Sequence, residues 1–292
     1  MSTQTAPRKK VTTLTFRKRK EYGEPITVLT AYDYATALAA DRAGIDCLLV
    51  GDSLGMVVLG YENTLAVTMD DMLHHAKAVA RGAKIPLLIG DMPFMSYQVS
   101  TQEAVRNAGR FLSEASMDAI KLEGGRAVAA TAEAIVGVGI PVMGHIGLTP
   151  QSVNQLGGYK AQGRTAIAAR RLIDDALTLQ DVGCFAIVLE AIPDRLAELI
   201  SRRLLIPTIG IGAGAGCDGQ VLVTHDLLGI FDRFTPKFVK KYANINGEML
   251  RAFTEYKNEV LSHQFPTHEH TYSMPDEEWH ELVSEFEEKE LA

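Results

Sequence analysis

The chain alternates between short apolar runs and longer segments in which apolar residues recur at helical spacing. Eight of the runs are predicted strands, at residues 27–33, 47–53, 85–91, 119–124, 140–148, 185–192, 206–214 and 219–229. Alanine-rich amphipathic segments between most of these runs are predicted helices, the clearest at residues 68–82, 100–116, 126–138 and 164–182. Because the strands are apolar at nearly every position, both faces of the sheet should be covered, which is typical of parallel strands.

Eight consecutive strand–helix units predict a (β/α)8 barrel, the TIM-barrel fold. An open, doubly wound sheet is the alternative, because a single sequence does not show whether a sheet closes on itself. We expect one catalytic barrel over residues 21–265, preceded by a basic arm at 1–20 and followed by a C-terminal extension at 266–292. The acidic end of the extension, residues 276–292, is predicted to form a surface helix.

Polar side chains stand at or near the carboxyl ends of successive predicted strands: Asp33, Asp52, Asp91, Glu123, His145 and Glu190. Any one of them could cap a following helix or be a satisfied polar residue of the core. Five carboxylates and a histidine around one rim are poorly explained by capping, and barrel enzymes assemble their active sites at this rim. The pattern therefore predicts an active site at the carboxyl end of the barrel.

Carboxylates that converge in a half-buried cavity repel one another and take up protons unless a cation holds them. Aspartate and glutamate oxygens, with no paired histidine or cysteine, suit Mg²⁺ or Mn²⁺ better than zinc. Mg²⁺ usually takes one or two carboxylates and leaves positions for water and substrate. We therefore expect Asp52 and Asp91 as ligands, with Glu123 as a third ligand or one that acts through water.

Lys121 lies two residues before Glu123 on one predicted strand, so both side chains should point into the barrel. Beside a metal the lysine is expected to bind a substrate anion, and an internal ion pair with Glu123 is the alternative. Glu190 follows four apolar residues, and such surroundings should raise the pKa of its carboxyl group, so it is the candidate general base. His145 could be a base, a ligand or a hydrogen-bond donor. The glycine-rich run 210–216 could closely approach a phosphate or a bulky ligand.

Composition narrows the function further. A net charge of -7 over 292 residues argues against a surface for nucleic acid or anionic membranes, and no apolar run approaches the roughly 20 residues that span a bilayer. Cys47, Cys184 and Cys217 are scattered and lack metal-ligand spacing, which indicates a reducing compartment, and we expect the cytoplasm. The basic N-terminal residues are expected to form a solvated arm rather than a transit peptide.

Particular segments carry a more specific signal, and they read LTAYDY, VGDSLGMVVLGYENTLAVTMDDMLHHAKAV, DMPFMSY, IKLEGG, PVMGHIGLTPQSVNQLGGYKAQGR, LEAIP, TIGIGAGAGCDGQVLVTHDLLG and FVKKYANI. They run in this order from about residue 12 to residue 265. In them the chain resembles the ketopantoate hydroxymethyltransferase family of pantothenate synthesis. The N-terminal arm and the C-terminal tail fall outside the best match.

The resemblance implies a barrel of the phosphoenolpyruvate/pyruvate type that transfers a hydroxymethyl unit from 5,10-methylenetetrahydrofolate to 3-methyl-2-oxobutanoate. The implied products are 2-dehydropantoate and tetrahydrofolate, and one Mg²⁺ per subunit would stabilise an enolate intermediate. The implied oligomer is a decamer, a pentamer of dimers. The resemblance assigns metal binding to Asp52, Asp91 and Glu123, substrate binding to Asp52, Ser53, Asp91, Lys121 and His145, and proton abstraction to Glu190.

Three other functions compete with this one. A Mg²⁺-dependent lyase or mutase for 2-oxo acids, of the phosphoenolpyruvate/pyruvate barrel group, would need the same carboxylates but no folate. A Schiff-base aldolase would use Lys121 as its nucleophile and leave the carboxylates without a purpose. A non-catalytic barrel would have little use for metal ligands and a base together.

Overall fold

Eight parallel strands pair in chain order and close into a barrel in the computed structural model, which describes residues 8–290. The predicted fold class is confirmed, since the first strand pairs with the last and the sheet is not open. The strands are β1 (Ile26–Thr30), β2 (Cys47–Val50), β3 (Leu87–Asp91), β4 (Ala119–Lys121), β5 (Val142–Gly147), β6 (Ala186–Glu190), β7 (Thr208–Ile211) and β8 (Gly219–Leu222). The last strand is shorter than predicted, because a helical turn begins at Thr224.

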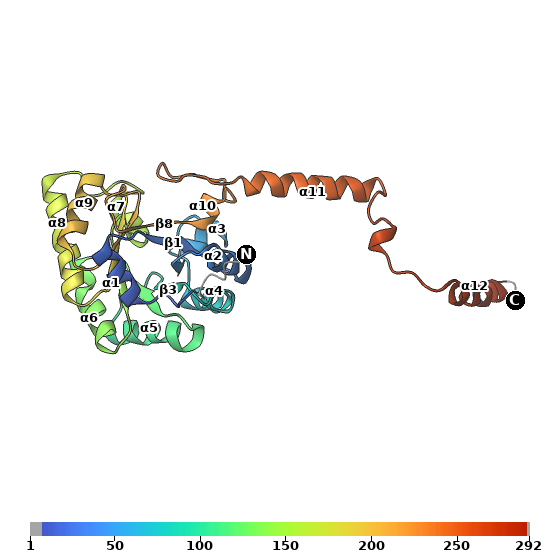
Figure 1. Cartoon of the computed structure of the whole chain (residues 1–292), viewed down its shortest axis with the longest axis horizontal. Coiled ribbons are helices and arrows are strands. Elements are labelled where there is room, and N and C mark those ends of the chain that lie inside the picture. Colours follow the sequence, from blue (N-terminus) through green and yellow to red (C-terminus); the bar gives the residue numbers. More distant parts are fainter. Residues whose placement is uncertain (1–7, 291–292) are drawn as a thin grey trace, which may run out of the picture. The chain divides into compact units, whose positions relative to one another are not determined.

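Helices follow most of the strands and lie around the outside of the barrel (Figure 1). Those in the same unit as the strands are α1 (Thr13–Tyr22), α2 (Tyr34–Ala43), α3 (Leu54–Val57), α4 (Met69–Gly82), α5 (Thr101–Ala115), α6 (Ala129–Gly137), α7 (Val153–Leu156), α8 (Ala166–Asp181), α9 (Asp194–Arg203) and α10 (Thr224–Leu227), with 3₁₀ turns at Arg126–Val128 and Pro150–Ser152. Across residues 8–290, none of the helices combines the length and apolar character needed to cross a membrane.

Alternate residues of each strand point to opposite sides of the barrel wall. Outward residues such as Leu48, Leu88 and Ile187 pack beneath the helices in one apolar cluster. The inward residues fill the barrel with a second cluster, here called the lumen cluster, whose strand members are Ile26, Val28, Cys47, Leu49, Leu87, Ile89, Ala119, Met143, Ala186, Val188, Ile209, Ile211 and Val221. The barrel is therefore packed solid below its carboxyl end, as TIM barrels are.

Helix α1 closes the amino end of the barrel. Phe16 is fully buried and joins the lumen cluster together with Val11. The ring of Phe16 meets that of Phe185 edge to face, with centroids 5.8 Å apart. Thr12 begins the helix with a capping box, and Gly23 ends it in the left-handed conformation.

Basic residues of this N-terminal segment pair with aspartates that directly precede strands. Arg19 forms two bonds to the carboxylate of Asp46, of 2.7 and 2.8 Å. Lys20 lies 2.8 Å from Asp218 and Lys10 lies 2.6 Å from Asp118. Residues 8–20 thus differ from the solvated arm that was expected, because their charges have fixed partners at the amino ends of three strands.

The chain divides into two units, Met1–Ala243 and Asn244–Ala292, so the division lies before the expected boundary at residue 265. The second unit contains α11 (Ile245–Leu261), which was not predicted, a 3₁₀ turn at His268–His270, and α12 (Asp276–Glu290). Within this unit the ring of Phe265 lies against those of Tyr256 and His270. Arg251 joins Glu248 and Glu255 along α11.

Phe16→Ala should lower the free energy of unfolding by about 3–5 kcal/mol, because it opens a cavity at the end of the lumen cluster. Leu14→Ala is the matched control, since Leu14 is on the same helix and 68% exposed. Urea unfolding monitored by circular dichroism measures both losses. Equal midpoints for the two variants would contradict a role for α1 in closing the barrel.

Candidate active site

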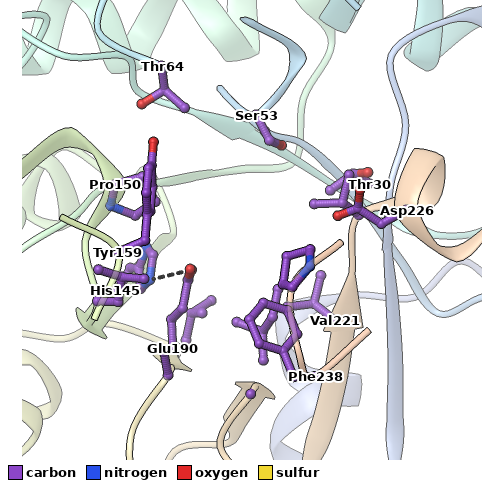
Figure 2. Close-up of a pocket in the computed structure, with 18 of the residues that line it drawn as sticks. Thr30, Ser53, Thr64, His145, Pro150, Tyr159, Glu190, Val221, Asp226 and Phe238 are labelled. Carbon is purple, nitrogen blue, oxygen red and sulfur yellow. Dashed lines mark ion pairs between the residues drawn. The ribbon is translucent and has the colours of Figure 1, made fainter. Parts of the chain in front are cut away.

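A cavity of about 750 Å³ lies at the carboxyl end of the barrel. Ser53, His145 and Glu190 point into it (Figure 2). Its lining includes seven residues that the sequence singled out: Asp52, Ser53, Asp91, Lys121, Glu123, His145 and Glu190. The structure therefore brings together all the predicted site residues except Asp33.

The polar residues occupy the inward positions directly above the lumen cluster. Asp91 lies two residues beyond Ile89, and Lys121 lies two beyond Ala119. His145 and Glu190 follow Met143 and Val188 by the same interval. Because strand side chains alternate, each residue that continues an inward apolar series must also point inward. The packed lumen and the polar cavity are consecutive layers of the same strands.

Lys121 and Asp91 are register partners on β4 and β3, and they form a buried ion pair with 2.6 Å between Nζ and Oδ1. Glu123 Oε1 is farther from Nζ, at 3.9 Å. Burial opposes the charge of Lys121, but the surrounding carboxylates outweigh it and raise the pKa of the ammonium group. The pairing of Lys121 with Glu123 that was considered from the sequence is thus secondary to its pairing with Asp91.

Asp52 meets Asp91 and Gln151. Its backbone N–H donates to Oδ2 of Asp91 at 3.2 Å, and its own Oδ2 accepts from Nε2 of Gln151 at 3.0 Å. Burial raises the pKa of Asp52 well above its ordinary value, and the negative charges of Asp91 and Glu123 add to the effect. A cation bound at this carboxylate would reverse the shift.

Gln151 is a site residue that the sequence analysis missed. Its backbone N–H donates to Oε2 of Glu123 at 3.0 Å, and its Nε2 also donates to the carbonyl of Met92 at 2.9 Å. Its Oε1 accepts from the hydroxyl of Tyr97 at 2.7 Å. One buried residue thus fixes the orientation of two carboxylates, Asp52 through its side-chain amide and Glu123 through its backbone N–H. The only sign of it in the sequence is its position six residues after His145.

His145 lies between two carboxylates. Its Nδ1 is 3.5 Å from Oε1 of Glu123, and its Nε2 is 3.2 Å from Oε2 of Glu190 (Figure 2). Neither contact meets the geometry of a hydrogen bond, so both are ion pairs. Burial and the charge of Lys121 oppose protonation, but the two carboxylates outweigh them and raise the pKa of His145 to about 9. At neutral pH the imidazolium therefore holds a positive charge beside Glu190.

Glu123 is stabilised in its charged form. Burial alone would raise its pKa, but His145, Lys121 and the backbone of Gln151 together lower it.

Ser53 directly follows Asp52 in the chain, and its Oγ lies 2.9 Å from the hydroxyl of Tyr32. A Cβ at Gly51, the residue that follows β2, would lie 2.9 Å from this Oγ.

Asp33 does not belong to the site, and this part of the rim prediction is wrong. Its carboxylate caps α2 by accepting bonds of 2.8 Å from the backbone and the hydroxyl of Thr36. Strand β1 ends at Thr30, so Asp33 lies beyond the rim and is exposed. An aspartate that follows a strand can either cap the next helix or bind a metal ion, and the sequence alone does not show which of the two roles it has.

The glycine run 210–216 allows close approach between parts of the chain. A Cβ on Gly214 or Gly216 would lie 2.6 Å from that of Asp194 or Glu198 on α9. These two glycines therefore make room for a helix. Gly212 and Gly214 also line the cavity, so close approach to a ligand, a phosphate or a bulky one, stays a prediction.

The donors suit a cation that needs few protein ligands. Among the side chains of residues 8–286, no three from His, Cys, Asp or Glu are grouped so as to hold a metal ion by themselves. Asp52 and Asp91 would supply the one or two carboxylates that Mg²⁺ usually takes from a protein, and water and substrate would complete its coordination. The charges fit as well: when ionised, these two carboxylates with Glu123 and Glu190, set against the nearby cations Lys121 and His145, leave two negative charges. A divalent ion would balance them.

A closed eight-stranded barrel with a carboxylate-rich cavity at its carboxyl end defines a TIM-barrel enzyme. A family model described as ketopantoate hydroxymethyltransferase matches residues 10–268, and the chain belongs to this family. The 3-methyl-2-oxobutanoate hydroxymethyltransferase of Syntrophus aciditrophicus (strain SB) is 58% identical over 272 residues, covering 93% of this chain and all of that protein. The resemblance and the enzyme class predicted from the sequence, a hydroxymethyltransferase, are confirmed.

Solved structures share the architecture. One is 2,3-dimethylmalate lyase, described as a PEP mutase/isocitrate lyase superfamily member, with a TM-score of 0.57, 16% identity, and 95% of this chain and 96% of that chain covered. Another is phosphonopyruvate hydrolase in complex with oxalate and Mg²⁺, with a TM-score of 0.56, 11% identity, and 96% and 98% covered. At these identities the likeness shows the fold.

Lys121→Met should lower the free energy of unfolding of the metal-free protein by about 3–5 kcal/mol, because it leaves the buried Asp91 without its cation. Lys77→Met is the control: the pair of Lys77 with Glu114, at 3.7 Å, is largely exposed, and its loss should cost under about 1 kcal/mol. Urea unfolding compares the two. A Lys121→Met variant as stable as Lys77→Met would show that Asp91 does not depend on the lysine.

Proposed function

We propose that the chain transfers the one-carbon unit of 5,10-methylenetetrahydrofolate to 3-methyl-2-oxobutanoate, giving 2-dehydropantoate and tetrahydrofolate in pantothenate synthesis. The observation that carries the proposal is the position of Glu190. This carboxylate faces the same cavity as the Lys121–Asp91 pair and contacts the charged ring of His145. A proton acceptor thus lies within one cavity with groups suited to an anionic 2-oxo acid.

Asp52 and Asp91 would hold Mg²⁺. Glu123 would act on the ion through water, because its oxygens already contact the backbone of Gln151 and the ring of His145. The fold neighbour that was solved with oxalate and Mg²⁺ is consistent with such a site. When bound, the ion would supply a Lewis acid that polarises the 2-oxo group of the substrate.

Lys121 and Ser53 would bind and orient the substrate. The ammonium group is a compact cation for the carboxylate of the acid, and the hydroxyl of Ser53 adds a donor whose orientation Tyr32 controls. Apolar lining residues, among them Leu49 and Val188, suit the branched carbon end of the molecule. The acid would thus lie with its charged end at Lys121 and its C3 carbon toward Glu190.

Glu190 would remove the proton from C3, and its carboxylate would become a carboxylic acid. His145 would orient the carboxylate and stabilise it until the proton arrives, so it is placed to position the base. The resulting enolate would form a bond from C3 to the methylene carbon, and the two bonds from that carbon to N5 and N10 of the folate would break. Water would supply the hydroxyl group of the product, and the proton held by Glu190 and one proton of the water would pass to the two nitrogens. We further propose, from the family resemblance, a decamer that acts in the cytoplasm.

The test is product formation followed by NMR. The wild-type protein should make 2-dehydropantoate only when 3-methyl-2-oxobutanoate, 5,10-methylenetetrahydrofolate and Mg²⁺ are all present, and chelation should stop the reaction reversibly. Cleavage or rearrangement of the 2-oxo acid without folate would contradict the proposal and favour a lyase or mutase.

The metal assignment has its own test. Asp52→Asn should weaken Mg²⁺ binding at least about tenfold in titration calorimetry, since even residues that only support metal ligands contribute that much. Asp33→Asn is the matched control, because Asp33 also follows a strand but caps α2 outside the cavity. Equal affinities in the two variants would remove Asp52 from the metal site.

A further inference from the structure

The cavity has far more room than a five-carbon acid fills. Its volume of about 750 Å³ falls within the roughly 300–1,000 Å³ of pockets that bury drug-sized ligands. The groups assigned to the acid come from β2 to β6, whereas other lining residues come from β8, from α10 and from the segment after it, including Asp226 and Phe238. This second part of the cavity has no role in the steps described so far.

Phe238 presents an aromatic face in this part. A Cβ on Gly212 would lie 2.7 Å from Cδ1 of Phe238, and Gly212 has a φ of +63°, so only glycine lets the ring approach the backbone just after β7 this closely. The ring nevertheless remains 37% exposed. Figure 2 shows it at the wall of the cavity. Its free face can therefore stack on a flat ligand.

Asp226 and Thr30 both line the cavity, and in Figure 2 they lie on the side opposite His145. The residue is only 8% exposed. Among the side chains that the structure describes, those of residues 8–286, and the backbone of residues 8–290, none donates a hydrogen bond to its carboxylate or forms an ion pair with it within 4.0 Å. Burial raises its pKa to about 6, and the charge of Lys241 offsets this only in part. A buried carboxylate without a donor is costly unless a ligand supplies one.

We propose that Asp226 and Phe238 form the subsite for the pteridine ring of the one-carbon carrier. A 2-amino-4-oxopteridine presents a ring N–H and an exocyclic amino group side by side, and one carboxylate can accept both hydrogen bonds. The ring system is flat and stacks on an aromatic side chain. The inference rests on the proposed function, because it takes the carrier to be a folate.

This arrangement separates the two reactants by their chemistry. The acid meets Lys121 and the paired carboxylates, and the pteridine meets the one carboxylate that has no cation or donor of its own. A ring without the amino group would leave Asp226 underpaired, so the subsite selects for that group. An aspartate with only a structural role would not make binding depend on the amino group of the pteridine.

The experiment measures binding of tetrahydrofolate and of its 2-desamino analogue by titration calorimetry, without 3-methyl-2-oxobutanoate. The wild type should prefer tetrahydrofolate by about 10- to 100-fold, as expected for hydrogen bonds to a charged group. Asp226→Asn should lose that preference and bind tetrahydrofolate about 10- to 100-fold more weakly. Phe238→Leu should weaken both ligands by the same factor, since stacking does not depend on the amino group.

Asp194→Asn is the matched control: Asp194 is exposed and lies against Gly214, but it does not line the cavity. It should bind both ligands like the wild type. If the wild type binds tetrahydrofolate and Asp226→Asn keeps both its affinity and its preference, the subsite is elsewhere and the proposed function stands. If the wild type binds no tetrahydrofolate, the folate step of the proposed function fails, and this inference fails with it.

Discussion

Lys121 is the charge on which the active-site end of the barrel depends. Its ammonium group lies 2.6 Å from Asp91 and 3.9 Å from Glu123, and all three side chains are almost fully buried. Without it, the carboxylates would face one another in a medium of low dielectric, where like charges repel strongly and carboxyl groups take up protons. His145 has the same effect between Glu123 and Glu190. Two cations thus allow Asp52, Asp91, Glu123 and Glu190 to share one part of the cavity and still leave net negative charge for a divalent ion.

The sequence was sufficient to predict the barrel and the main residues of its site for one physical reason. Parallel strands covered on both sides are apolar throughout, so a charged residue at a strand end stands out, as Asp91 and Glu190 do. The two-residue period then shows that Lys121 and Glu123 share a face. Which carboxylate pairs with the lysine was not predictable, because it depends on register between strands. The structure pairs it with Asp91, from the neighbouring strand.

Features that depend on contacts distant in the sequence were missed. Gln151 lies in a turn without periodicity, and it matters because its amide reaches Asp52, which is 99 residues away in the chain. The basic N-terminal segment has the composition of a solvated arm, and only the fold shows that Arg19 and Lys20 meet Asp46 and Asp218. The amino end of the barrel is thus closed by Phe16 and the ion pairs around it, whereas the carboxyl end holds the charged residues of the cavity.

Glu190 is proposed to take the C3 proton before the one-carbon carrier is needed. The most direct measurement is exchange of that proton for deuterium, followed by NMR in D₂O with enzyme, Mg²⁺ and 3-methyl-2-oxobutanoate but no folate. The wild type should exchange it, and so should Glu198→Gln, whose glutamate is exposed on α9. Glu190→Gln should not, although it should still bind the acid, because an amide cannot accept the proton. Exchange that continues in Glu190→Gln at the wild-type rate would contradict the account and place the base elsewhere.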